Sequence, residues 1–166
     1  MSRKMSKALV IDASVAKSAG ETEHPVSSAC RQALSTALEI CHRVVICKEI
    51  LKEWKKHKSR YSSSWLAAME SKGKVVRIEI SIDNNLSGKL EQLEIGANGI
   101  KAMIKDLHLV EAALQTDTRI LSCDEAARGL FRSASDHIGE LRPIIWVNPV
   151  LVEDNCIEWL KTGAKK

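Results

Sequence analysis

The fold is decided first by ALVIDASV, residues 8–15, where an apolar run leads directly into a single acid, Asp12. A continuous apolar run of this length is typical of a short strand that is buried on both faces of a sheet. An ionised carboxylate beside a core is costly unless it is paired or binds a metal. The stretch therefore predicts a core strand that ends at an acid with a specific partner.

Further short apolar runs follow, and segments with helical periodicity separate them. The predicted strands are 8–11, 43–47, 74–80, 119–123 and 142–149, and the predicted helices are 25–41, 48–60, 62–73, 87–94, 104–116 and 124–135. This alternation indicates right-handed βαβ units. We therefore expect an α/β fold, a three-layer α/β/α sandwich with a central parallel sheet of about five strands. Residues 1–150 would form one domain, and residues 151–166 would form a frayed C-terminal tail.

The composition is that of one globular domain, with 166 residues, 45% hydrophobic residues, 28% charged residues and a formal net charge of +4. The five cysteines include no C-x-x-C pair, and most lie in apolar runs, which indicates free thiols in a reducing compartment. The apolar run before Asp12 is too short for a secretory leader, and no run reaches the ~20 apolar residues of a membrane span. We therefore expect a cytoplasmic protein without a membrane partner.

Acids follow or adjoin the carboxyl ends of the predicted strands, where open α/β sheets bind their ligands. They are Asp12 after the first strand, Glu53 or its rival Glu49 after the second, Asp106 in the expected first turn of helix 104–116, and Asp124 after the fourth strand. Clustered carboxylates repel each other, and a hard cation such as Mg²⁺ or Mn²⁺ removes that conflict. Structural roles stay open, because Asp106 and Asp124 could be helix N-terminal acids and Glu53 could form an exposed salt bridge.

Four stretches together resemble the PIN domain family: ALVIDASV (8–15), VVICKEILKEW (44–54), KDLHLVEAAL (105–114) and RILSCDEAARGLF (119–131). PIN domains are α/β/α folds, and many are metal-dependent endoribonucleases, including the toxins of toxin–antitoxin pairs. The resemblance implies that the catalytic, metal-binding acids are Asp12, Glu53, Asp106 and Asp124, with Mg²⁺ or Mn²⁺ as the cofactor. It also implies that Ser14 is the hydroxyl residue of the site. RNA would be the substrate, and the resemblance is compatible with a homodimer and with an antitoxin protein as partner.

An acidic centre repels a phosphate backbone, so the rim around it should be basic if RNA binds there. Basic residues gather in helix 48–60, before the first strand and beside Asp106; they are Lys48, Lys52, Lys55, Lys56, Lys58, Arg60, Arg3, Lys4, Lys7, Lys101 and Lys105. Each of them could also belong to a solvated helix face. Trp54 falls on the apolar stripe of helix 48–60 and is expected in the core.

A catalytically silent PIN-like domain that binds RNA or protein stays open as an alternative, although all four acid positions are filled. A response-regulator receiver is disfavoured, because Asp12 stands alone and IIWVNP (144–149) offers no lysine. A dinucleotide-binding fold is also disfavoured, since no G-x-G-x-x-G follows a predicted strand.

Overall fold

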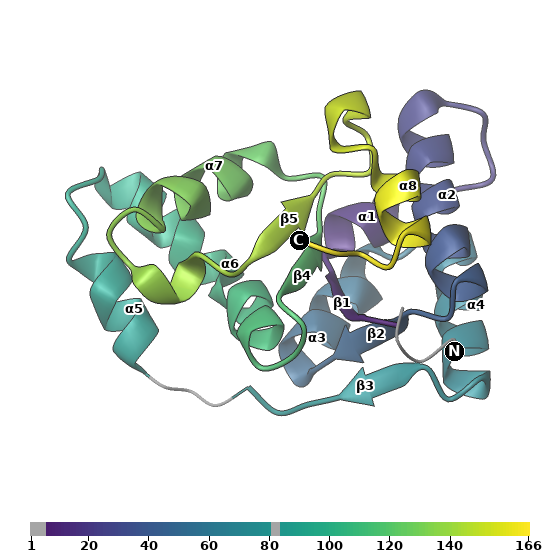
Figure 1. The fold of residues 1–166 in the computed structure, drawn as a ribbon, viewed down its shortest axis with the longest axis horizontal. Helices are drawn as coiled ribbons and strands as arrows, with labels where there is room; N and C mark the ends of the chain where they lie inside the picture. The colour runs from purple at the N-terminus through teal and green to yellow at the C-terminus, as the bar shows by residue number, and fades with distance from the viewer. Residues whose placement is uncertain (1–5, 81–83) are drawn as a thin grey trace.

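The computed structural model describes residues 6–80 and 84–166, and its centre is a five-stranded sheet in the order β3-β2-β1-β4-β5 (Figure 1). The strands are β1 (Ala8–Ile11), β2 (Arg43–Ile46), β3 (Val75–Arg77), β4 (Arg119–Leu121) and β5 (Ile145–Val147). Every neighbouring pair in this order is parallel. The predicted α/β class and the predicted parallel sheet of five strands are therefore confirmed.

Helices cover the sheet on both sides and complete the three layers. They are α1 (Ala13–Ser18), α2 (Pro25–Glu39), α3 (Lys48–His57), α4 (Arg60–Ser71), α5 (Asn84–Glu91), α6 (Ala97–Leu114), α7 (Glu125–Ala134) and α8 (Cys156–Lys161), with 3-10 helices η2 (Gly139–Leu141) and η3 (Val152–Asp154). Figure 1 shows α2, α4 and α8 to one side of the sheet and α5, α6 and α7 to the other. Helix α6 packs on β1 and β4, and α2 contacts both α4 and α8.

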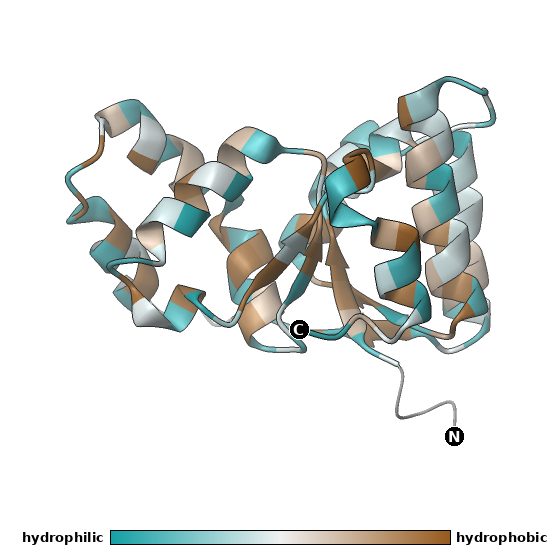
Figure 2. Cartoon of the chain, turned by 45° about the horizontal axis from the view of Figure 1, so that its top comes forward, coloured by the Kyte–Doolittle hydropathy of each residue, from teal (hydrophilic) through white to brown (hydrophobic). Residues whose placement is uncertain are grey.

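The strands supply the middle of the core, which appears as the brown centre of Figure 2. Leu9, Val10 and Ile11 of β1 are fully buried, as are Ile120 and Leu121 of β4. Burial on both faces explains why these strands are continuous apolar runs without polar alternation. Among residues 6–80 and 84–166, no helix combines the length and the apolar character that crossing a membrane requires.

Helix α6 begins earlier than the sequence predicts, at Ala97 and not near residue 104. Asn98 and Gly99 are typical of a turn, but Gly99 packs closely against the side chain of Leu130 on α7. Met103 is fully buried and extends the apolar stripe of the helix towards its N-terminus. The prediction that Asp106 lies in the first turn is therefore wrong, because this residue lies in the third turn.

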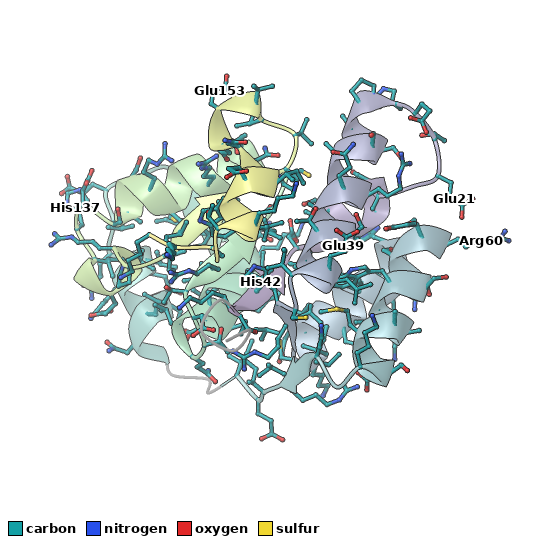
Figure 3. The ribbon with its side chains drawn as sticks, turned by 45° about the vertical axis from the view of Figure 1, so that its right-hand side comes forward. Glu21, Glu39, His42, Arg60, His137 and Glu153 are labelled. Carbon is teal, nitrogen blue, oxygen red and sulfur yellow. The ribbon has the colours of Figure 1, made fainter. Side chains whose placement is uncertain are left out.

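The C-terminal segment is packed against the domain, so the prediction of a frayed tail is wrong. Leu160 and Ala164 are fully buried, and α8 contacts α2. His42, labelled in Figure 3, is also fully buried, and its Nε2 lies 2.8 Å from the carbonyl oxygen of Leu160. Arg119 Nε donates to the carbonyl oxygen of Ala164 at 2.8 Å. These long-range bonds join the C-terminal segment to β4 and to the residue directly before β2.

Candidate active site at the carboxyl edge of the sheet

Asp12 leaves β1 at the edge of the sheet where β1 and β4 lie side by side. Its N–H donates to the carbonyl oxygen of Leu121 at 2.9 Å, which continues the β1–β4 pairing by one residue. Asp12 is the N-cap residue of α1, but its side chain makes no capping hydrogen bond. The carboxylate is half-buried and accepts hydrogen bonds on Oδ2 from Ser14 Oγ at 2.8 Å and from Ser122 Oγ at 2.9 Å. The acid that follows the first strand is thus held by two hydroxyl groups.

The same two hydroxyls tie Asp12 to the segment that follows β4. Ser14 Oγ accepts the N–H of Cys123 at 3.1 Å, and Ser122 Oγ accepts the N–H of Asp124 at 3.0 Å. The two oxygens lie 3.5 Å apart. Ser14 therefore lies beside the first acid as predicted, whereas Ser122 is a site residue that the sequence analysis missed. The signal for it was a polar residue, fully buried in the structure, inside the apolar run RILSC.

Asp124 is the N-cap residue of α7, and its Oδ1 accepts the N–H of Ala127 at 2.9 Å. The helix-capping role that the sequence analysis left open for Asp124 is therefore present. The capping bond engages one oxygen, and Oδ2 has no hydrogen-bond partner among the described residues. Asp12 is similar, because both of its hydrogen bonds within the described chain end on Oδ2. Each carboxylate is thus oriented through one oxygen and leaves the other for a ligand.

Asp106 approaches these two acids from α6, the helix that packs on β1 and β4. Its side chain is half-buried. Burial raises the pKa of Asp106, and the negative charges of Asp12 and Asp124 raise it further, while His108 and Lys105 lower it. The charges of two acids from distant parts of the chain therefore act on Asp106 at this edge. Asp106 cannot be a helix-capping acid, because it lies inside the helix.

Glu53 has a different environment from the three aspartates. It lies on α3, forms an ion pair with Lys56 at 3.8 Å and lies 3.9 Å from His57 Nε2, and its side chain is 37% exposed. The salt bridge left open by the sequence is therefore present. Its rival Glu49 is exposed in the first turn of the same helix. A catalytic or metal-binding role for either glutamate stays a prediction.

Trp54 positions the strand that carries Asp12. It is fully buried, as expected, and its Nε1 donates to the carbonyl oxygen of Ile11 at 2.9 Å. Its ring stacks on Trp65 of α4, with ring centroids 6.0 Å apart. The carbonyl that Trp54 binds belongs to the residue directly before Asp12. A tryptophan of α3 thus helps to fix the end of β1 and the acid that follows it.

The basic side chains expected to form a rim lie mainly on the exposed surface of α3 and α6. Lys48, Lys52, Lys55, Lys56, Lys58 and Arg60 are exposed on α3 and at the start of α4, and Lys101 and Lys105 are exposed on α6. Helices α3 and α6 contact each other, so the two groups belong to neighbouring elements. Lys7 is half-buried before β1, and Arg3 and Lys4 lie outside the described residues. Lys105 is the one of these lysines whose charge acts on Asp106 in the described part of the chain. A basic rim around the acids stays a prediction.

The donor chemistry of the three aspartates suits a hard divalent cation, because carboxylate oxygens are the ligands that Mg²⁺ and Mn²⁺ prefer. Within residues 6–80 and 84–166, however, no group of three or more His, Cys, Asp or Glu side chains is arranged closely enough to hold a metal ion. Mg²⁺ commonly keeps several waters and binds only one or two carboxylates directly. A cation shared by the three aspartates, with water completing its coordination, stays a prediction.

No protein-family model matches this chain, and no curated protein matches it. The resemblance to PIN domains therefore rests on the four sequence stretches that carry it. The structure agrees with that resemblance in fold class, since it has a parallel sheet between two layers of helices. Membership of the PIN family stays a prediction.

Proposed function

We propose that this chain is a PIN-type ribonuclease that uses Mg²⁺ or Mn²⁺ to hydrolyse RNA phosphodiesters at the carboxyl edge of its sheet. The proposal rests mainly on the convergence of Asp12, Asp106 and Asp124 from three separate elements. Like charges brought together in partial burial oppose folding, and such arrangements concentrate at functional sites. The same location, outside the carboxyl ends of parallel strands, is where α/β sheets bind ligands.

Asp12, Asp106 and Asp124 would hold the cation, with water completing its coordination. When bound, a divalent cation lowers the pKa of water and polarises phosphoryl oxygen. The protein's own part is orientation. Ser14 and Ser122 fix Asp12 through one oxygen, and the capping bond to Ala127 fixes Asp124 through one oxygen. The remaining oxygens of both aspartates are available to the cation, and a pre-oriented ligand loses little freedom when it binds.

The basic rim supports RNA as the substrate class. Exposed lysines lie on the neighbouring helices α3 and α6, and the charge of Lys105 acts on Asp106. Contacts of this kind hold a phosphate backbone without selecting a base sequence. They also offset the repulsion between the acidic centre and the incoming phosphates.

A catalytically silent PIN-like module that binds RNA is the second candidate. Two observations favour it: Glu53 is engaged with Lys56 and His57, and the described residues contain no ready-made metal cluster. Such a module would keep the basic rim and bind RNA without cleaving it. The two functions differ because the ribonuclease needs divalent cations and Asp12 to cleave RNA, whereas the silent module needs neither to bind it.

The test is cleavage of a mixed RNA pool with Mn²⁺, with Mg²⁺ and with EDTA. The ribonuclease is expected to cleave only when the cation is present, and Asp12→Asn is expected to abolish cleavage. Asp136→Asn is the matched control, because Asp136 is an exposed aspartate after the end of α7. Cleavage by Asp12→Asn at the wild-type rate would overturn the site. RNA binding without cleavage under all conditions would favour the silent module.

A further inference from the structure

Three of the five cysteines converge on the candidate active site from distant parts of the chain. Cys30 lies on α2, Cys123 stands between Ser122 and Asp124, and Cys156 begins α8. The Sγ atoms of Cys30 and Cys123 are 3.6 Å apart, although 93 positions separate the two residues. Cys156 lies near both, because its charge acts on Cys30 and the charge of Cys123 acts on it. This cluster of thiols has no role in the proposed hydrolysis.

Cys30 and Cys123 are the pair whose sulfur atoms are in contact within the described chain. A disulfide bond is about 2.05 Å long, so the two sulfurs would need to approach by roughly 1.5 Å. Cys123 is partly exposed, whereas Cys30 and Cys156 are buried. A soluble oxidant would therefore reach Cys123 first, with Cys30 in contact to complete the bond.

The backbone of Cys123 is part of the network that holds the acids. Its N–H donates to Ser14 Oγ, which in turn donates to Asp12 Oδ2. The residues on either side of Cys123 are Ser122, which binds Asp12, and Asp124 itself. Drawing the sulfur of Cys123 towards α2 would act directly on these bonds. The state of the thiol pair is thus coupled to the geometry of the aspartates.

The geometry points to a reversible disulfide between Cys123 and Cys30 that disables the acid site when a peroxide is present; the loss of activity rests on the proposed ribonuclease function. The Cys123 sulfur attacks the O–O bond of hydrogen peroxide and becomes a sulfenic acid, and one water is released. The Cys30 thiol then attacks that sulfur, which forms the S–S bond and releases a second water. In total the two thiols lose two electrons and two protons, and the peroxide is reduced to water. An added dithiol reverses the reaction by exchange.

The bond is tested on the full chain by counting thiols after denaturation and by mapping the linked peptides. Treatment with hydrogen peroxide is expected to lower the count from five to three and to link the peptides that contain Cys30 and Cys123. Cys30→Ala is expected to lose this link, and Cys41→Ser, which changes an exposed cysteine, is expected to keep it. An unchanged count of five, a link from Cys123 to Cys156, or dimers linked through Cys41 would each overturn the assignment.

The switch is tested on the mapped disulfide form after removal of the peroxide. This form is expected to cleave RNA roughly tenfold more slowly than the reduced protein, a loss of about 1.4 kcal/mol, and to recover with dithiothreitol. Equal cleavage by the disulfide form and the reduced protein would overturn the switch, but not the disulfide itself. Absence of cleavage in both forms would overturn the proposed ribonuclease and with it the switch, and the peptide map would still decide whether the bond forms.

Discussion

Ser122→Ala tests whether one buried hydroxyl holds two of the acids in place. Ser122 is fully buried, donates to Asp12 Oδ2 at 2.9 Å and accepts the N–H of Asp124 at 3.0 Å. A hydrogen bond to a charged group contributes about 1.5–3 kcal/mol, and one between neutral groups contributes about 0.5–1.5 kcal/mol. Ser14 keeps its own bond to Asp12 in the variant. We therefore expect a loss of roughly 2–3 kcal/mol in the free energy of unfolding.

The assay is thermal and urea unfolding in EDTA, followed by RNA cleavage with Mn²⁺. A domain of this size loses roughly 2–4 °C in Tm per kcal/mol, so Tm should fall by about 4–12 °C. Cleavage should fall by roughly tenfold or more, because Asp12 and Asp124 lose a shared support. Both effects should be absent in the control Ser35→Ala, whose hydroxyl donates, among the described residues, to the carbonyl oxygen of Gln32 on the exposed side of α2. A variant with the wild-type Tm and the wild-type cleavage rate would refute the role of Ser122.

Three further changes test the charge of Asp106, the pH response of His42 and the packing of α8. The raised pKa of Asp106 means that the folded state loses stability as pH rises from about 3.8 through the raised value. Asp106→Asn should therefore raise Tm in EDTA at neutral pH and reduce the increase in Tm that Mn²⁺ gives. A lower Tm in EDTA would count against repulsion between Asp106 and the other two aspartates. Burial, followed by the charges of Arg43, Lys7 and Lys74, lowers the pKa of His42, so the unfolded chain takes up the proton first and stability should fall as pH drops below 6.5. In urea unfolding at several pH values, His42→Gln should lack this loss of stability, whose slope can reach about 1.4 kcal/mol per pH unit. An unchanged slope of the free energy of unfolding against pH would exclude His42 as the source of the loss. Leu160→Ala removes a fully buried side chain and should cost about 2–5 kcal/mol in urea unfolding; a cost near zero would mean that α8 is not packed in solution.

The parallel sheet could be predicted because its signal is local. Each strand is a short apolar run between helical segments, and such runs indicate burial on both faces wherever they occur. Asp12 could be singled out for the same reason, since a carboxylate directly after LVI requires a partner. These inferences need only neighbouring residues and the general rules of sheet topology.

The remaining features depend on contacts between distant residues. Helix α6 extends back to Ala97, where the contacts of α6 with α7 and the burial of Met103 outweigh the turn preference of Asn98 and Gly99. The bonds from Ser122 to Asp12 and from Leu160 to His42 join residues that are 110 and 118 positions apart. A hydroxyl in an apolar run indicates a buried polar residue but does not show which distant residue it binds, and a leucine near a lysine-rich end gives no local sign of its partner.

The most direct measurement of the central claim is calorimetric titration of Mn²⁺ into the metal-free protein. If Asp12, Asp106 and Asp124 share one cation, the wild type binds it and each Asp→Asn change at these positions weakens binding by roughly tenfold or more, which corresponds to about 1.4 kcal/mol. The exposed Asp136→Asn should bind like the wild type. A wild-type protein that binds no Mn²⁺, or three variants that bind it as well as the wild type does, would contradict the shared site.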